Sequence, residues 1–170
     1  MNINFEKILV EFQSFLKSLP DITESKLISF AFSLEKPENL DLINNLSEAF
    51  VDIFLFRTAN NKLLSIGLNS TLELNPENSK QFSEVANNFN YWKQNFLYNR
   101  TDEFNPAHSI IFCSAKFDSN NSTILWSEFH TLRFYVPEFV LVLESNRLTG
   151  HYNFRLNEHG KFDFHSSKLL

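Results

Sequence analysis

Glycine is almost missing from this 170-residue chain, which contains only Gly67, Gly150 and Gly160. Loops that cradle phosphate groups need glycine, because only a residue without a side chain lets the backbone approach the ligand closely. Neither a Gly-x-Gly-x-x-Gly string nor a Gly-x-x-x-x-Gly-Lys-Ser/Thr string occurs in the sequence. The sequence therefore disfavours dinucleotide-binding and P-loop folds.

A chain of 170 residues fits one domain that can bury a core without a disulfide or metal to stabilise it. Phenylalanine is abundant, with 20 residues, and the 21% share of charged residues is ordinary for a globular protein. We find no linker, internal repeat or low-complexity tract. Residues 1–170 are therefore predicted to form a single domain.

The charge pattern limits the class of partner. The formal net charge is −5, and lysine and arginine are scattered singly rather than gathered in a basic stripe. Proteins that bind nucleic acid usually carry such a stripe, so no nucleic-acid partner is expected. The apolar N-terminus is interrupted by Glu6, Lys7, Glu11 and Lys17, which argues against a signal peptide or a membrane span.

A single cysteine, Cys113, lies inside an apolar run after Ile110. One cysteine gives no disulfide framework and indicates a reducing compartment. We therefore predict a cytoplasmic protein in which Cys113 is a small buried core residue rather than a reactive thiol.

Hydrophobic periodicity predicts the elements of the first half of the chain. Apolar residues on one helical face predict an amphipathic helix over 4–18 that ends before Pro20. The apolar runs 51–56 and 63–68 are joined by a polar link, which predicts a hairpin. Two further elements complete this half, a strand over 26–34 and a short helix over 40–49.

The second half is predicted to change from helix to strand. Asn75-Pro76-Glu77 has the composition of a helix start, and the helix is expected to reach Asn99. Apolar stretches then predict antiparallel strands over 108–117, 139–144 and 148–155. The predicted fold is α+β, with helices on one face of a mostly antiparallel sheet. The side chains that the helix is expected to bury are Phe82, Val85, Ala86, Phe89, Trp92 and Phe96.

Histidines are the first candidates for chemistry, because they are common metal ligands and acid–base groups. Glu128 and His130 would share one face of a strand and could hold a metal together. Nothing nearby supplies a third ligand, so solvated or hydrogen-bonded histidines are the favoured interpretation. The other histidines, at 108, 151, 159 and 165, lack helical or zinc-knuckle spacing.

Acidic residues and tryptophans are the remaining candidates. A catalytic carboxyl needs an apolar pocket that raises its pKa. The acids Glu35, Glu38, Asp41, Asp102 and Glu103 fall in expected loops, where solvation is the favoured interpretation. Trp92 and Trp126 lie among phenylalanines and are predicted to be core anchors rather than a ligand platform. No catalytic, cofactor-binding or metal-binding residue is therefore assigned from the residues alone.

Three segments together resemble a signature of isochorismate synthases. They are His108–Asp118, Trp126–Phe129 and Phe134–Phe139. In that family a strand with two glycines and flanking aromatic residues precedes a tryptophan, a phenylalanine and a leucine-proline strand start. Upstream, Ile53–Arg57 and Ser65–Gly67 are similar to two further strands of the family. Cys113-Ser114 stands where the family has its glycine doublet, and Glu138 stands where it has arginine.

The resemblance implies the N-terminal half of a chorismate-utilising enzyme fold. In such enzymes the general-base lysine, the general-acid glutamate and the magnesium-binding glutamates lie in the C-terminal half. Lys168 has none of the lysine motif around it. The resemblance thus implies an isochorismate-forming enzyme in which this chain is a structural part, inactive alone, and chorismate and magnesium are bound only by the complete enzyme. The implied partner is the catalytic half or a second copy, and the alternative is a free-standing, non-catalytic binding domain.

Overall fold

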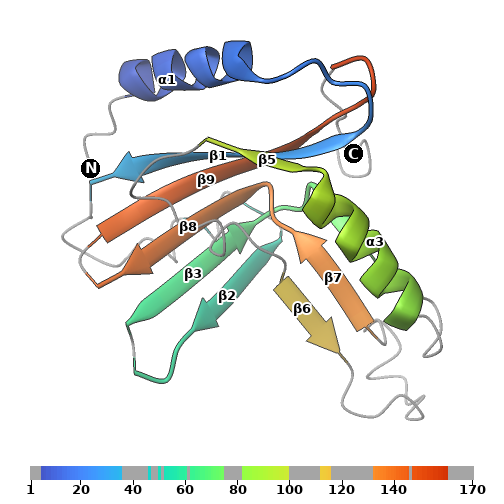
Figure 1. The fold of residues 1–170 in the computed structure, drawn as a ribbon. Helices are drawn as coiled ribbons and strands as arrows, with labels where there is room; N and C mark the ends of the chain where they lie inside the picture. The colour runs from blue at the N-terminus through green and yellow to red at the C-terminus, as the bar shows by residue number, and fades with distance from the viewer. Residues whose placement is uncertain are drawn as a thin grey trace.

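The computed structural model describes residues 5–35, 46, 50, 52–60, 62–74, 82–99, 112–115, 132–145 and 147–160. These residues form two helices and nine strands in two sheets (Figure 1). The helices are α1 (Phe5–Ser18) and α3 (Phe82–Gln94). The strands are β1 (Lys26–Leu34), β2 (Ile53–Arg57), β3 (Leu63–Leu68), β4 (Leu72–Leu74), β5 (Phe96–Tyr98), β6 (Phe112–Ala115), β7 (Leu132–Val136), β8 (Phe139–Glu144) and β9 (Arg147–Leu156).

The larger sheet has six strands in the order β2-β3-β8-β9-β1-β5, and the smaller sheet has the order β4-β7-β6. Every pair of neighbours is antiparallel except β1 and β5, which are parallel. The long pair β1–β9 runs from Lys26 opposite Leu156 to Leu34 opposite Leu148. The prediction of an α+β protein with mostly antiparallel pairing is confirmed.

Helix α1 covers one face of the larger sheet (Figure 1). Its phenylalanine Phe12 lies with its ring centroid 5.1 Å from that of Phe30 and 5.8 Å from that of Phe154. Ile28, which is fully buried, belongs to the same apolar cluster. The amphipathic pattern of α1 therefore supplies the cover for the apolar side of β1 and β9.

The opposite face of the larger sheet packs against the smaller sheet and α3. Leu27 points away from α1, because consecutive residues of a strand alternate between faces. It clusters with Leu72 of β4 and Val136 of β7, and Trp92 of α3 packs against the same cluster. The prediction that Trp92 is a core anchor is confirmed. The two helices, which were predicted to share one face of the sheet, lie on opposite faces of the larger sheet, because a second sheet and α3 together cover the face that α1 leaves open.

Several predicted elements match the structure. The helix 4–18, the strands 26–34, 139–144 and 148–155, and the hairpin of β2 and β3 are all confirmed. The short helix 40–49 and the helix start at Asn75-Pro76-Glu77 lie outside the described residues, apart from Leu46, which is helical. Of the strand 108–117, the described part is β6. The strands β4, β5 and β7 were not predicted as elements.

The prediction that the second helix reaches Asn99 is wrong. Helix α3 ends at Gln94, and both the backbone N–H and the side-chain amide of Asn95 donate to the carbonyl of Tyr91. The aromatic residues that follow form β5 beside β1, where β-propensity and a free sheet edge favour a strand. The predicted buried face is only partly correct, because Val85 is buried whereas Ala86 and Phe89 are exposed, and Phe96 belongs to β5.

The prediction that Cys113 is buried is also wrong, because its side chain is exposed. It lies on β6, an edge strand of the smaller sheet. Its neighbour Phe112 points toward Phe54 of the larger sheet, with ring centroids 6.0 Å apart. The alternation of strand side chains therefore directs Cys113 to the other side. The surrounding protein nevertheless removes enough solvent to raise the pKa of the thiol, so it is protonated at neutral pH.

Candidate functional site

The face of the larger sheet that is turned toward the smaller sheet carries buried polar side chains. Strand β1 contributes Ser29, and β9 contributes His151 and Asn153, each at most 1% exposed. Asn153 lies opposite Ser29 across the β1–β9 ladder, and His151 lies opposite Ala31. His151 and Asn153 share one face because they are two residues apart on β9, and Ser29 shares it because residues directly opposite each other on neighbouring strands point to the same face. The result is a polar strip in the interior of the protein, which we call the inner polar strip.

Asn153 joins the strip to the turn between β7 and β8. Its side-chain amide donates to the carbonyl oxygen of Pro137 at 2.9 Å, and its backbone N–H donates to that of Glu138 at 2.7 Å. The carboxylate of Glu138 accepts from the side-chain amide of Asn69 at 3.4 Å. One side chain of the larger sheet thus fixes the place where the chain passes from one sheet to the other.

Ser29 contributes a hydroxyl that is entirely inaccessible to solvent. Its Oγ has no hydrogen-bond partner among the residues that the structure describes. Burying a hydroxyl without a partner costs about 1–3 kcal/mol, so such groups are uncommon in folded proteins. The strip is therefore a polar environment that could accept an ordered water or a small polar group.

Neighbouring Asn99 satisfies the free side of β1. Its side-chain oxygen accepts from the Ala31 N–H at 2.7 Å, and its amide donates to the Ala31 carbonyl at 2.8 Å. This bidentate contact takes the place of the backbone bonds that β5 would make to β1 if it continued past Tyr98. In the described part of the chain, the side chains of Asn99 and Asn153 thus stabilise the fold by satisfying backbone groups.

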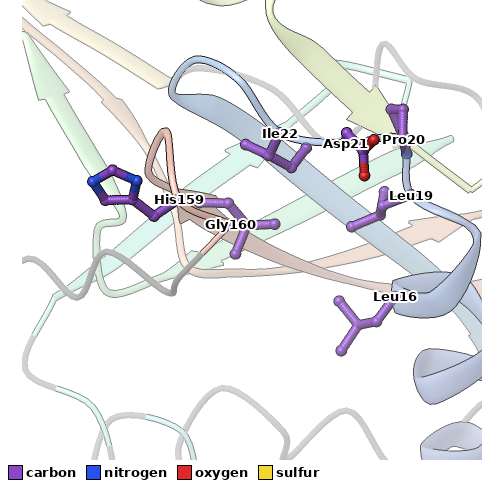
Figure 2. Close-up of a pocket in the computed structure, with 8 residues that line it drawn as sticks. Leu16, Leu19, Pro20, Asp21, Ile22, His159 and Gly160 are labelled. Atoms are coloured by element: carbon purple, nitrogen blue, oxygen red, sulfur yellow. The ribbon is translucent and has the colours of Figure 1, made fainter.

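A second candidate is a pocket of about 460 Å³ between the end of α1 and the end of β9 (Figure 2). One wall is apolar, and Asp21 and His159 are its ionisable groups. In Figure 2 the imidazole of His159 points away from Leu16 and Leu19. The pocket therefore offers a surface that is partly apolar and partly polar, and its one imidazole does not face the leucines. Its lining residues are Leu16, Leu19, Pro20, Asp21, Ile22, Leu156, His159 and Gly160.

Most of the candidate residues named from the sequence lie outside the part of the chain that the structure describes. Glu35 and His159 are exposed, in agreement with their interpretation as solvated residues, and His159 lies 3.7 Å from Glu158. His151 is buried in the inner polar strip. In the described part of the chain, no three His, Cys, Asp or Glu side chains gather to hold a metal. The candidates outside the described residues are Glu38, Asp41, Asp102, Glu103, His108, Trp126, Glu128, His130, His165 and Lys168.

The inner polar strip was missed by the sequence analysis. Strand β9 alternates polar His151, Asn153 and Arg155 with apolar Tyr152 and Phe154. Such alternation ordinarily indicates one buried and one solvent-exposed face. A second sheet covers the polar face here, so the alternation was the available signal but not a sufficient one.

Tyr152 lies between His151 and Asn153 on β9, but its side chain points to the α1 side. Burial raises the pKa of Tyr152, and the negative charge of Glu138 raises this pKa further. Its hydroxyl therefore stays protonated at neutral pH. It can donate a hydrogen bond, but it is not a base.

The sequence profile of a family described as chorismate binding enzyme matches residues 14–169, which is most of the chain. The chain belongs to this family. No curated protein matches the chain. Within the described residues, no helix has the length and apolar character needed to cross a membrane.

Proposed function

We propose that this chorismate-binding family member is the structural, N-terminal part of an isochorismate-synthase-like enzyme. The reaction would convert chorismate to isochorismate for menaquinone, phylloquinone or siderophore synthesis. In this proposal the chain is inactive alone, and a separate catalytic part supplies the acid–base residues. The family match and the sequence resemblance to isochorismate synthases support it.

One observation in particular supports the proposed structural role. Segments of the resemblance that are far apart in sequence meet where the two sheets join. Phe54 of β2 stacks on Tyr135 of β7 with ring centroids 3.7 Å apart, and Phe112 of β6 stacks on the same ring. Gly67 of β3 lies so close to Pro137 that an added Cβ would be 2.5 Å from the Cγ of the proline. The motif residues therefore pack against one another, which is what a scaffold requires.

The proposed reaction requires magnesium, but we assign no magnesium site in this chain. The described residues bring together no set of carboxylates or imidazoles that fits a metal ion. Mg²⁺ prefers several oxygen ligands in octahedral geometry, and buried Ser29 and Asn153 alone do not supply them. We therefore derive no reaction step through magnesium here.

The proposal is tested by a chromatographic assay of chorismate conversion with magnesium present. The chain alone should give no isochorismate above the buffer blank. Co-expression with the C-terminal half of a related isochorismate synthase should give a soluble complex with at least the ~1,000 Å² of buried surface typical of a specific interface. Magnesium-dependent turnover by the chain alone would overturn the structural role.

A free-standing binding domain is the second candidate function. The pocket beside α1 favours it, because its volume of about 460 Å³ lies in the range of small-molecule sites. Calorimetric titration with chorismate separates the two functions. Binding by the isolated chain that is lost on Leu16→Lys, without turnover and without complex formation with the catalytic half, would favour the binding domain.

A further inference from the structure

Strand β9 is longer than its neighbour β8 at the end beside the pocket. β8 begins at Phe139, opposite Tyr152, whereas β9 runs on to Leu156 along β1. Next to the start of β8, the N–H of Asn153 donates to the carbonyl of Glu138 at 2.7 Å. The preceding strand, β7, belongs to the smaller sheet. Among the described residues, no strand therefore lies beside the last three residues of β9 on the β8 side.

The turn that follows β9 has the form of a hairpin loop. The N–H of Gly160 donates to the Asn157 carbonyl at 2.9 Å, and the N–H of His159 donates to the Asn157 side chain at 3.0 Å. Gly160 has a φ of 66°, in the left-handed region. A turn that ends in a left-handed glycine is typical of a three-residue hairpin loop, after which the chain runs back antiparallel to the strand it has left. Such a loop places residue 161 opposite Asn157.

The direction of the backbone groups decides on which side of β9 the chain returns. Alternate residues of a strand direct their N–H and C=O groups to opposite sides. Asn153 directs its N–H toward β8, so Asn157, four residues later, directs its backbone groups to the same side. Residues 161–164, which lie outside the described part of the chain, are next in sequence. The turn therefore leads them into the place in front of β8.

We propose that residues 161–164 form a strap that pairs antiparallel with the end of β9 and places Phe162 in the pocket beside α1. The register set by the turn puts Phe162 opposite Leu156 and Phe164 opposite Phe154. Leu156 lines the pocket, and Phe154 belongs to the same apolar cluster under α1. Both phenylalanines of the strap therefore point to the α1 side. The proposal goes beyond the proposed function and does not depend on it.

The sequence of the strap agrees with this register. Residues 161–164 read Lys-Phe-Asp-Phe, an alternation of polar and aromatic residues. Phe162 and Leu156 form a pair without backbone hydrogen bonds, where side chains approach most closely. Asp163 lies opposite Arg155 on the other face, and opposite charges across a strand pair are favourable. A shift of one residue would turn both phenylalanines to the polar face.

The pocket suits an aromatic side chain from this segment. Leu16, Leu19 and Ile22 form its apolar wall, and its volume is about 460 Å³. Gly160 itself lines the pocket (Figure 2), and a Cβ added to it would lie 4.0 Å from the Cβ of Ile22. Phe162 is two residues further on and so at most about 7 Å along the chain. The strap thus closes the pocket from within, and a small molecule enters only when Phe162 leaves.

Dye binding by the full chain tests whether the strap closes the pocket. Phe162→Lys should raise the fluorescence of anilinonaphthalene sulfonate, which binds exposed apolar surface, because the pocket opens. Leu169→Lys is the matched control, since it makes a similar change outside the strap. Near-UV circular dichroism checks that both variants keep their tertiary packing. Equal dye fluorescence of the two folded variants would overturn the proposal.

Crosslinking tests the register in a Cys113→Ser background, because Cys113 is exposed. Leu156→Cys with Phe162→Cys should form an intramolecular disulfide on mild oxidation, because Cα atoms of such a pair lie about 4.5 Å apart, within disulfide range. Leu156→Cys with Phe164→Cys is the control, and its diagonal pair should keep both thiols. Thiol titration counts them. Equal oxidation of the two pairs, or oxidation of the control alone, would overturn the register.

Nuclear Overhauser effects in the unmodified chain identify the occupant of the pocket directly. The methyl groups of Leu16 and Leu156 should show contacts to the ring protons of Phe162. Contacts to a different segment of the chain, or to no aromatic ring, would overturn the strap. Addition of chorismate should leave the Phe162 contacts in place unless the ligand enters the same pocket, in which case the contacts are lost as the ligand binds.

Discussion

The two faces of the β1–β9 pair are equally buried but chemically different. On the α1 side, Ile28 and Phe154 lie among aromatic rings, and on the other side Ser29 and Asn153 form the inner polar strip. Ile28 and Ser29 are both 0% exposed although they are neighbours in sequence. The comparison teaches that alternation within a strand decides which face a side chain joins, whereas the elements packed on each face decide whether it is buried.

The largest effect is expected on the aromatic face. Phe154→Ala should lower the free energy of unfolding by about 3–5 kcal/mol, because it removes a buried ring that packs edge-on against Phe12. Chemical denaturation measures the change. A loss as small as that of an exposed control, Val10→Ala on α1, would mean that α1 does not cover this face in solution.

A smaller effect is expected at the turn between the two sheets. Asn153→Ala removes the side-chain bond to the Pro137 carbonyl and leaves that acceptor buried. Such a loss costs about 1–3 kcal/mol. Denaturation of Asn153→Ala and of Asn69→Gly separates this bond from nonspecific effects, because glycine tolerates the positive φ of 51° at position 69 and the change removes only the longer 3.4 Å amide contact to Glu138. Equal stabilities would contradict the anchoring role of Asn153.

Ser29→Ala should not cause the loss of stability that deletion of a buried, hydrogen-bonded polar group usually causes. Its Oγ lacks a partner among the described residues, so removing it relieves a buried polar group. We expect stability to stay within about 1 kcal/mol of the original chain or to rise. Ser18→Ala is the control, because its hydroxyl donates to the Phe15 carbonyl at an exposed position. Strong destabilisation by Ser29→Ala would show that the hydroxyl holds an ordered water or ligand.

The smallest effect is expected on stability at alkaline pH, through Tyr152 on the α1 side. Burial first, and the charge of Glu138 second, raise the pKa of Tyr152 above its ordinary value of 10.0. The folded state then holds the proton more tightly than the unfolded state, so stability is constant below about pH 10 and falls as pH rises through the folded pKa. Tyr152→Phe should remove this part of the alkaline loss. Identical pH profiles of the two proteins would contradict it.

Much of the fold could be predicted from the sequence, because its longer elements have strong local patterns. The periodic apolar residues of α1 and the strands β1, β8 and β9 could be located nearly to their ends. The short strands β4 and β5 could not, since three residues carry no periodicity. The end of α3 was placed too late because Phe96 fits a helical spacing as well as it fits a strand.

The candidate site was less accessible to sequence reasoning. The alternation in β9 indicated two chemically different faces, but nothing local says whether the polar face meets water or a second sheet. Cys113 was misplaced for the same reason, since an apolar run indicates burial and cannot show that its strand lies at a sheet edge. Burial is a property of the packed elements and not of the segment that carries the residue.

By itself the sequence determined the α+β class, the antiparallel hairpins, and the motif segments that resemble isochorismate synthases. These depend on periodicity and residue type within short stretches of chain. Tertiary structure alone decided that Phe54, Gly67, Phe112 and Pro137 meet, that the polar face of β9 is buried, and that β2 is left at an edge. Each of these depends on contacts between residues distant in sequence, and those contacts are fixed only when the two sheets pack and exclude water.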